Sequence, residues 1–303
     1  MSLKYLINKI QRVILGLFLM LTTLTALSPA QNAASKYARA EIPTPVLNTA
    51  DFQSIFGGLD GKTLALDSQG LIRAVEFVAL PGTVFEIQNT FHVKGKTLYQ
   101  VSTHEYPPQK TGLYIDSRFV SVSTTPFSSR KITLPSKKQI IDTMLSHEGA
   151  RYIWGGNVSR GIPQMFQFYP PSQQLSVNEE QMWSLYGLDC SGLLYEATNG
   201  FTPRNTSDLI SFGKPVYINA LSSTQIAEKL LPLDLIVWKG HVIIVLDQNH
   251  TIESCLNCST RGGVTVRNLK TVLQEVMKTR TPVNSYPSQT KANEKFFVIR
   301  RWI

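Results

Sequence analysis

The feature that most constrains this chain is the stretch 187–194, which predicts a helix that begins at a cysteine. Asp189 is suited to cap the helix, because its short side chain accepts hydrogen bonds from backbone N–H groups left free in the first turn. Apolar residues follow at helical spacing, and Asn199-Gly200 supplies the stop. Cys190 therefore lies in the first turn, where the helix dipole favours thiolate over thiol. The alternative is a small buried hydrophobe, which free cysteines commonly are.

The composition is that of a folded protein. The chain has 303 residues, of which 43% are hydrophobic and 17% charged, enough for one large or two modest domains. Removal of residues 1–30 would lower the net charge from +9 to +6, and this mild basic excess suits work beside an anionic polymer such as a bacterial envelope. A solvated surface of no special meaning is the alternative. Lysine and arginine do not form a stripe with interleaved aromatic residues, so we predict no nucleic-acid partner.

The first 30 residues have the order of a secretory signal peptide. Three basic residues precede an apolar run, 13–27, and small residues follow at 28–30. The run is short for a membrane span, which needs about 20 residues. We therefore predict an exported protein of the periplasm or cell envelope, or a secreted one, with no stable span after removal of residues 1–30. An uncleaved N-terminal anchor is the alternative.

The chain contains three cysteines, Cys190, Cys255 and Cys258. In an exported protein the last two could close a disulfide and leave Cys190 as a free thiol. A zinc site is a weaker interpretation, because a lone CxxC offers two ligands where a structural site needs four. A redox role lacks the strand–CxxC–helix context. We predict no metal and no cofactor.

The pattern along the chain predicts an α+β protein. Short strands with frequent turns from 51 to 122 indicate a small all-β barrel, and apolar strands after 232 indicate an antiparallel sheet against the cysteine helix. The segment 158–187, rich in proline and aromatic residues, is interpreted as a partly helical flap near the site. The predicted organisation is signal peptide 1–30, tether 31–50, barrel 51–122, linker 123–136, a helix from Lys137 through Ser146, a second domain over 137–303 with the insert 158–187, and a closing strand at 295–303.

A base for the thiol is available at His241, which begins an expected strand directly after a turn. Histidine titrates near neutral pH and is suited to accept a thiol proton. Glu253 follows twelve residues later on the neighbouring strand, where such spacing brings two residues roughly abreast. Its carboxylate could hold the Nδ1–H of the imidazole. His250 is a second candidate for this third position.

Several motifs then occur in a characteristic order. Together they resemble the NlpC-type cysteine peptidases, papain-like enzymes of bacterial cell walls, over residues 137–303. The segments 80–83 and 112–120 resemble the bacterial Src-homology-three-like barrels that precede such domains. The motifs of the second domain are Tyr152-Ile153-Trp154-Gly155-Gly156, Leu188-Asp189-Cys190-Ser191-Gly192-Leu193, Pro203-Arg204-Asn205-Thr206-Ser207, Pro232-Leu233-Asp234-Leu235 and Gly240-His241-Val242.

The resemblance implies hydrolysis of the bond between γ-D-glutamate and a diamino acid in peptidoglycan stem peptides. It implies Cys190 as nucleophile, His241 as base and Glu253 as third residue. It also implies that substrate-binding residues, Tyr152, Asp189 and Ser191, line the donor subsite, with Asp189 facing a free N-terminal amine of the substrate. The backbone N–H of Cys190 is suited to help hold the oxyanion.

The chain departs from the family pattern at three places. Glu253 replaces a histidine or neutral amide, Leu233 replaces a glycine, and the insert 158–187 is longer than usual. Two other functions stay open, a papain-like amidase or acyltransferase acting on another acyl group, and an inert protein that binds the cell wall. The sequence leaves open the diamino acid, the choice between intact wall and released muropeptides, the state of Cys255 and Cys258, and the oligomeric state.

Overall fold

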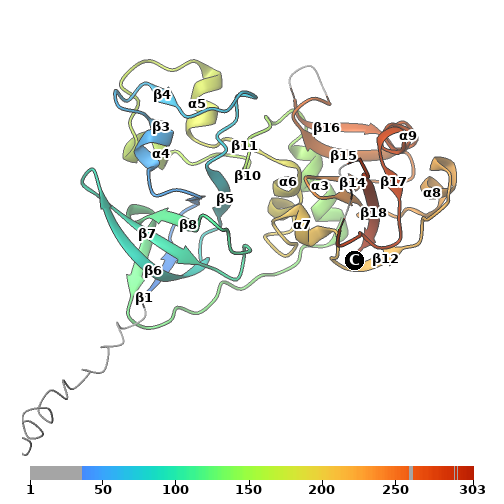
Figure 1. Cartoon of the computed structure of the whole chain (residues 1–303), viewed down its shortest axis with the longest axis horizontal. Helices are drawn as coiled ribbons and strands as arrows, with labels where there is room; N and C mark the ends of the chain where they lie inside the picture. Colours follow the sequence, from blue (N-terminus) through green and yellow to red (C-terminus); the bar gives the residue numbers. More distant parts are fainter. Residues whose placement is uncertain (1–35, 259–261, 290, 292) are drawn as a thin grey trace, which may run out of the picture. The chain divides into compact units, whose positions relative to one another are not determined.

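The computed structural model describes residues 36–258, 262–289, 291 and 293–303. Residues 36–303 form one compact unit of helices and mainly antiparallel sheets (Figure 1). The expected signal peptide, 1–30, lies outside the described residues. Within these ranges, no helix combines the length and the apolar character needed to cross a membrane.

The N-terminal sheet has the strand order β5-β2-β8-β7-β6-β1-β9 and antiparallel pairing throughout. One buried cluster on this sheet includes Val46, Phe77, Phe85 and Ile115. The strands are β1 (Lys36–Ala40), β2 (Thr44–Leu47), β5 (Val75–Ala79), β6 (Val84–Val93), β7 (Lys96–Ser102), β8 (Leu113–Asp116) and β9 (Val120–Ser123). Short elements beside it are α2 (Phe52–Ile55), β3 (Phe56–Gly57), β4 (Thr63–Leu64) and the 3-10 turn η1 (Ser117–Phe119).

The segment interpreted as a tether, 31–50, differs from that expectation over its described part. Residues 36–47 contribute β1 and β2 to the N-terminal sheet, where β1 pairs with β6 and β9. Ala38 and Val46 are fully buried. Alanine and proline gave this stretch the composition of a linker, but pairing with distant strands and burial of the small apolar side chains order it.

The segment 158–187 is partly helical, as expected, but much of it is buried. It contains α4 (Gln164–Phe168) and α5 (Val177–Trp183). The short strands at its two ends, β10 (Asn157–Val158) and β11 (Gly187–Leu188), pair with each other. Trp183 is 1% exposed and donates its Nε1–H to the carbonyl oxygen of Tyr169 at 2.7 Å. The Tyr169 hydroxyl donates to Asp116 at the end of β8, at 2.5 Å. These contacts anchor the segment to the N-terminal sheet.

The second sheet has the order β12-β18-β13-β14-β15-β16, and β17 pairs with the far end of β18. The strand β18 therefore lies between β12 and β13, although it follows every other strand of the sheet in the chain. The strands are β12 (Lys214–Val216), β13 (Leu235–Trp238), β14 (His241–Val245), β15 (His250–Cys255), β16 (Gly263–Asn268), β17 (Thr281–Pro282) and β18 (Phe296–Arg301). The remaining helices are α3 (Lys137–Ser146), α6 (Cys190–Ala197), α7 (Thr206–Leu209), α8 (Ser223–Lys229) and α9 (Leu269–Thr279).

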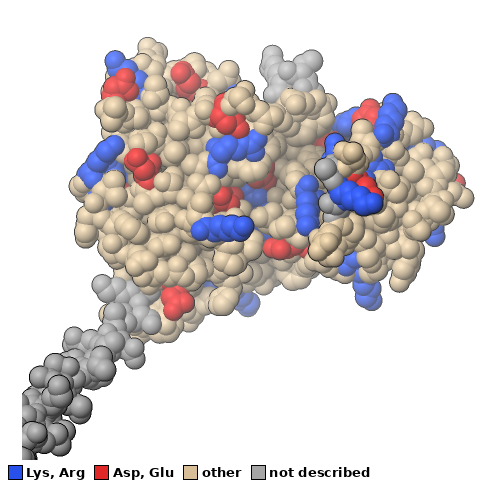
Figure 2. Space-filling model, in the orientation of Figure 1, with Lys and Arg blue, Asp and Glu red and all other residues tan. Residues whose placement is uncertain are grey.

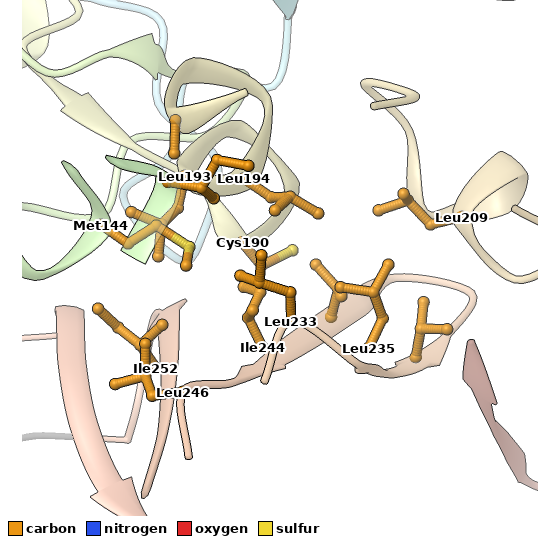
Figure 3. Packing of buried hydrophobic residues seen from close by; sticks show 14 of the residues in the cluster. Met144, Cys190, Leu193, Leu194, Leu209, Leu233, Leu235, Ile244, Leu246 and Ile252 are labelled. Carbon is orange, nitrogen blue, oxygen red and sulfur yellow. The ribbon is translucent and has the colours of Figure 1, made fainter. Parts of the chain in front are cut away.

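The helices α3 and α6 pack with the second sheet in one hydrophobic cluster. Figure 3 shows Leu193 and Leu194 of α6 on the helix side of this cluster, with Ile244 and Ile252 on the strands. The bounds expected for α3 are confirmed, and its start is fixed by a capping box between Ser136 and Gln139. On the face drawn in Figure 2, cationic and anionic side chains are interspersed.

Candidate active site

The helix start expected at Cys190 is confirmed. Asp189 is the N-cap of α6, and its Oδ1 accepts the Gly192 N–H at 2.7 Å. Cys190 is the first helical residue, and it is a free cysteine that is 6% exposed. The N–H groups of a first helical turn lack partners within the helix, so the sulfur lies where the dipole favours negative charge.

His241 lies between Cys190 and Glu253. It is the first residue of β14, and its Nε2 lies 2.6 Å from Glu253 Oε2. The Cys190 side chain lies close enough to the same ring to raise its pKa. Since Nε2 is used by Glu253, Nδ1 is the ring nitrogen left for the sulfur. The carboxylate expected at Nδ1 therefore lies at Nε2 instead.

The strand register explains how Glu253 reaches the ring. Ile244 pairs with Ile252, so the same register sets Glu253 opposite Ile243 rather than His241. His241 is two residues from Ile243 and therefore a diagonal neighbour of Glu253, within reach of long side chains. His241 and Glu253 were expected to lie directly opposite each other, but they are displaced by two residues along the strands. A displacement of two residues leaves both side chains on the same face of the sheet.

The charges of the site reinforce one another. Burial lowers the pKa of His241, but the hydrogen bond and charge of Cys190, followed by those of Glu253, raise it to about 10. Burial raises the pKa of Glu253, but His241 and then Arg267 hold it below its ordinary value. The arrangement therefore favours an imidazolium at His241 beside an ionised Glu253 carboxylate.

Asp189 is engaged by a buried arginine. Arg204, which is 3% exposed, donates from Nη2 to Asp189 Oδ2 at 2.6 Å and from Nη1 to Oδ1 at 3.0 Å. Its Nη1 also donates to Ser191 Oγ at 2.8 Å, and its Nε donates to Asn157 Oδ1 at 3.0 Å. A bidentate arginine–carboxylate pair is strong and directional. The charge of Asp189 is therefore compensated within the protein, and the Ser191 hydroxyl is used in the same network.

Tyr152 lies near the cysteine. Burial first, and then the charges of Asp189 and Cys190, raise the pKa of its phenol, so this group stays protonated. Tyr152 forms an isolated bridge with Leu188, two residues before Cys190. It also lines a pocket of about 80 Å³ together with Trp154 and Leu256. A cavity of about 1210 Å³ lies elsewhere, and Cys190 and His241 are not among its lining residues.

His250 lies apart from this arrangement. Its Nδ1 is 3.0 Å from the Asp247 carboxylate, and its side chain is 52% exposed. The structure thus places Glu253, rather than His250, beside His241.

Cys255 and Cys258 are joined as a disulfide. Among the described residues, Glu253 and these two cysteines are the group whose candidate metal-ligand atoms lie within 4.8 Å of one another. The two sulfur atoms form a covalent bond with each other, and the Glu253 carboxylate is hydrogen-bonded to His241 and Arg267. The atoms of this group are therefore already engaged.

Sequence reasoning missed the residues that support the site. Arg204 belongs to the motif 203–207 and lies one position before Asn205, the N-cap of α7. Asn157 directly follows the motif 152–156 and is fully buried. Arg267 stands alone in the sequence, and strand pairing alone brings it to Glu253.

Leu233, at the position where the family pattern has glycine, has a φ of 72° and is 1% exposed. This is the left-handed conformation that glycine adopts freely and leucine rarely does. Leu233 therefore takes a backbone conformation that glycine would adopt without strain, and its side chain is buried in the cluster around α6.

No family model matches the chain, and no curated protein matches it. Several solved structures are similar to it, among them the following two. An NlpC/P60 family protein from Bacillus cereus ATCC 10987 matches with a TM-score of 0.33 and 16% identity, over 89% of this chain and 64% of that protein. RipD from Mycobacterium tuberculosis, described as a non-catalytic NlpC/p60 domain protein adapted to peptidoglycan binding, matches with a TM-score of 0.29 and 15% identity, over 54% of this chain and 95% of that protein. This chain thus spans less than two thirds of the length of the first, and at these TM-scores neither likeness decides its family or activity.

Proposed function

We propose that this chain is a cysteine peptidase that hydrolyses the γ-D-glutamyl–diamino acid bond of peptidoglycan stem peptides. The observation that carries the proposal is the proximity of Cys190, at the start of α6, to the ring of His241. That ring is hydrogen-bonded to the buried carboxylate of Glu253. The bond assigned to the enzyme comes from the ordered sequence motifs, which resemble those of NlpC-type peptidases. The proposal includes export to the cell envelope.

The proposed reaction is acyl transfer to the thiol and then to water. The Cys190 thiolate attacks the γ-glutamyl carbonyl carbon, and the negative charge that develops on the carbonyl oxygen is stabilised beside the Cys190 N–H. The imidazolium of His241 protonates the amine of the diamino acid as the C–N bond breaks, leaving a thioester. Neutral His241 then takes a proton from water, which attacks the thioester and releases the γ-glutamyl carboxylate and the thiolate.

On the donor side, the proposal assigns Tyr152, Asp189 and Ser191 to substrate binding. Asp189 Oδ1 receives hydrogen bonds from Gly192, Arg204 and Ser191, whereas Oδ2 receives one from Arg204. An N-terminal amine of the substrate would therefore approach Oδ2. This role requires the amine to share the carboxylate with Arg204.

The test is cleavage of L-Ala-γ-D-Glu-diaminopimelate followed by mass spectrometry. Cys190→Ala is expected to reduce turnover to less than about one thousandth of wild type, because the nucleophile is lost. His241→Ala is expected to do the same, whereas His250→Ala, the same change at an exposed histidine, retains activity. Circular dichroism checks that each variant is folded.

The outcomes separate the proposal from its alternatives. Full activity of folded Cys190→Ala would exclude a cysteine mechanism. A product that carries the acyl group on an added amine, in place of a free γ-carboxylate, would indicate an acyltransferase. No turnover, together with alkylation of Cys190 no faster than that of a free thiol, would indicate a protein that binds the wall without cutting it.

A further inference from the structure

The carboxylate of Glu253 has a second partner besides His241. Its Oε1 accepts a hydrogen bond from Arg267 Nη1 at 3.2 Å, while its Oε2 faces His241 Nε2 at 2.6 Å. The Glu253 side chain is 3% exposed. A buried carboxylate tends to take up a proton unless nearby positive charge compensates it. A neutral imidazole does not supply that charge, whereas a guanidinium does at every working pH.

The sheet places the two partners on opposite sides of Glu253. Glu253 pairs with Thr265 of β16, and Arg267 is two residues further along that strand. Arg267 is therefore a diagonal neighbour on one adjacent strand, as His241 is on the other. Because residues two apart in a strand share a face, the three side chains extend from the same side of the sheet.

The Arg267 side chain is itself oriented by an ion pair with a more exposed residue, Glu275. Its Nη2 is ion-paired with Glu275 of α9, while Nη1 points to Glu253. The Arg267 side chain is 24% exposed and the Glu275 side chain 48% exposed. The planar guanidinium thus bridges a buried carboxylate and an outer one, which fixes its plane relative to Glu253.

We propose that Arg267 is a positioning residue of the active site, which acts through Glu253 by keeping this carboxylate ionised and turned toward His241. An ionised Glu253 stabilises the imidazolium that accompanies the Cys190 thiolate. A protonated Glu253 would lose this effect, and the thiol would ionise only at higher pH. The consequence for peptide cleavage rests on the proposed function, whereas the consequence for thiol reactivity does not.

The other titratable and charged groups near Glu253 and His241 lie on several elements. On the α6 side these are Cys190, the phenol of Tyr152 and the ion pair of Asp189 with Arg204. Cys255, on the strand of Glu253, is joined to Cys258 and does not titrate. The Trp238 ring lies 5.2 Å from that of His241, and Arg280 stacks on the Trp238 ring. Besides His241, the described residue with a positively charged side chain hydrogen-bonded to Glu253 is Arg267.

The test is the pH dependence of Cys190 alkylation by iodoacetamide, measured by mass spectrometry without reductant so that Cys255 and Cys258 stay joined. In Arg267→Met the apparent pKa for alkylation is expected to rise by about one unit or more, which lowers the alkylation rate about tenfold at pH values below the wild-type apparent pKa. Arg267→Lys restores part of the shift, since it keeps the charge. Glu275→Gln, which leaves the contact with Glu253 in place, shifts the profile less than Arg267→Met.

A double-mutant comparison separates positioning from general damage. Glu253→Gln alone is expected to raise the apparent pKa, and adding Arg267→Met to it is expected to cause no further rise, because Arg267 acts through the carboxylate. A folded Arg267→Met variant with the wild-type profile would overturn the proposal, and so would additive shifts in the double variant. If alkylation shifts as expected while wild type cleaves no muropeptide, the proposed function fails and this inference stands.

Discussion

At the residue scale, Glu253 supplies a fixed negative charge where the family pattern has a histidine or a neutral amide. A neutral third residue can orient an imidazole, but a carboxylate also stabilises its protonated form. With Arg267 behind it, Glu253 is a buried anion between two cationic groups. The environment of the carboxylate, rather than its residue type, makes the substitution compatible with the proposed chemistry.

A first prediction concerns stability in acid. The pKa of Glu253 is below its ordinary value, so its contribution to stability is present above about pH 4.5 and is lost as the pH falls further. Urea denaturation should therefore show a steeper loss of unfolding free energy below that pH in wild type than in Glu253→Gln. Glu228→Gln, a matched change at an exposed residue of α8, should keep the wild-type slope. Equal slopes for wild type and Glu253→Gln would contradict the pKa direction.

Residues of the site were predictable from sequence to the extent that their signals are local. Cys190 follows a capping residue, and His241 follows a turn at a strand start. The contributions of Arg204 and Arg267 could not be derived in this way. Each depends on a contact with a partner 14 or 15 residues away, and such a contact exists only after strands and loops have packed.

At the element scale, the N-terminus of α6 depends on one side chain with two tasks. Asp189 caps the helix and also compensates the buried charge of Arg204. An ordinary cap, such as Ser136 at the start of α3, has the first task alone and lies at the surface.

The second prediction compares these two caps by urea denaturation. Ser136→Ala should lower the free energy of unfolding by about 1 kcal/mol, the usual cost of a lost cap. Asp189→Ala should lower it by about 4 kcal/mol, because it also leaves a buried arginine without its partner. Similar losses for the two variants would mean that the ion pair with Arg204 contributes little.

Elements were predicted best where their ends carry their own signals. The aspartate before Cys190 predicted one helix start from sequence alone, and the start expected at Lys137 coincides with a capping box of Ser136 and Gln139. Strands β1 and β2 were missed, because nothing within residues 36–47 marks them as strands. These residues adopt strand conformation because they pair with β6, β9 and β5, which lie more than 25 residues away in the chain.

At the scale of the whole molecule, the N-terminal sheet and the cysteine helix are tied at both ends of α6. Near its start, Asn157 pairs with the N–H and C=O of Val78 in β5 while also accepting from Arg204. Near its end, the Tyr195 hydroxyl donates to Glu105 at 2.8 Å. The geometry of the candidate site therefore depends on strands that contribute no catalytic side chain.

The third prediction tests the second of these ties. Glu105 also forms an ion pair with Arg130, a side chain that is 8% exposed. Glu105→Gln should lower the free energy of unfolding by about 3 kcal/mol, since it leaves that arginine without its counter-charge. Glu41→Gln, a matched change in the exposed pair with Arg39, should cause no measurable change. Equal stability of both variants and wild type, measured by thermal unfolding, would argue against a tie through Glu105.

The position of β18 has a consequence for the time at which activity can arise. This strand separates β12 from β13, yet a ribosome makes it after every other strand of that sheet. Until residues 296–301 have emerged, β13 lacks a neighbour on one side, and the platform under Cys190 is incomplete. A nascent chain would therefore reach its reactive state after synthesis of this segment. If the chain is the peptidase proposed above, such a delay would also postpone its hydrolytic activity.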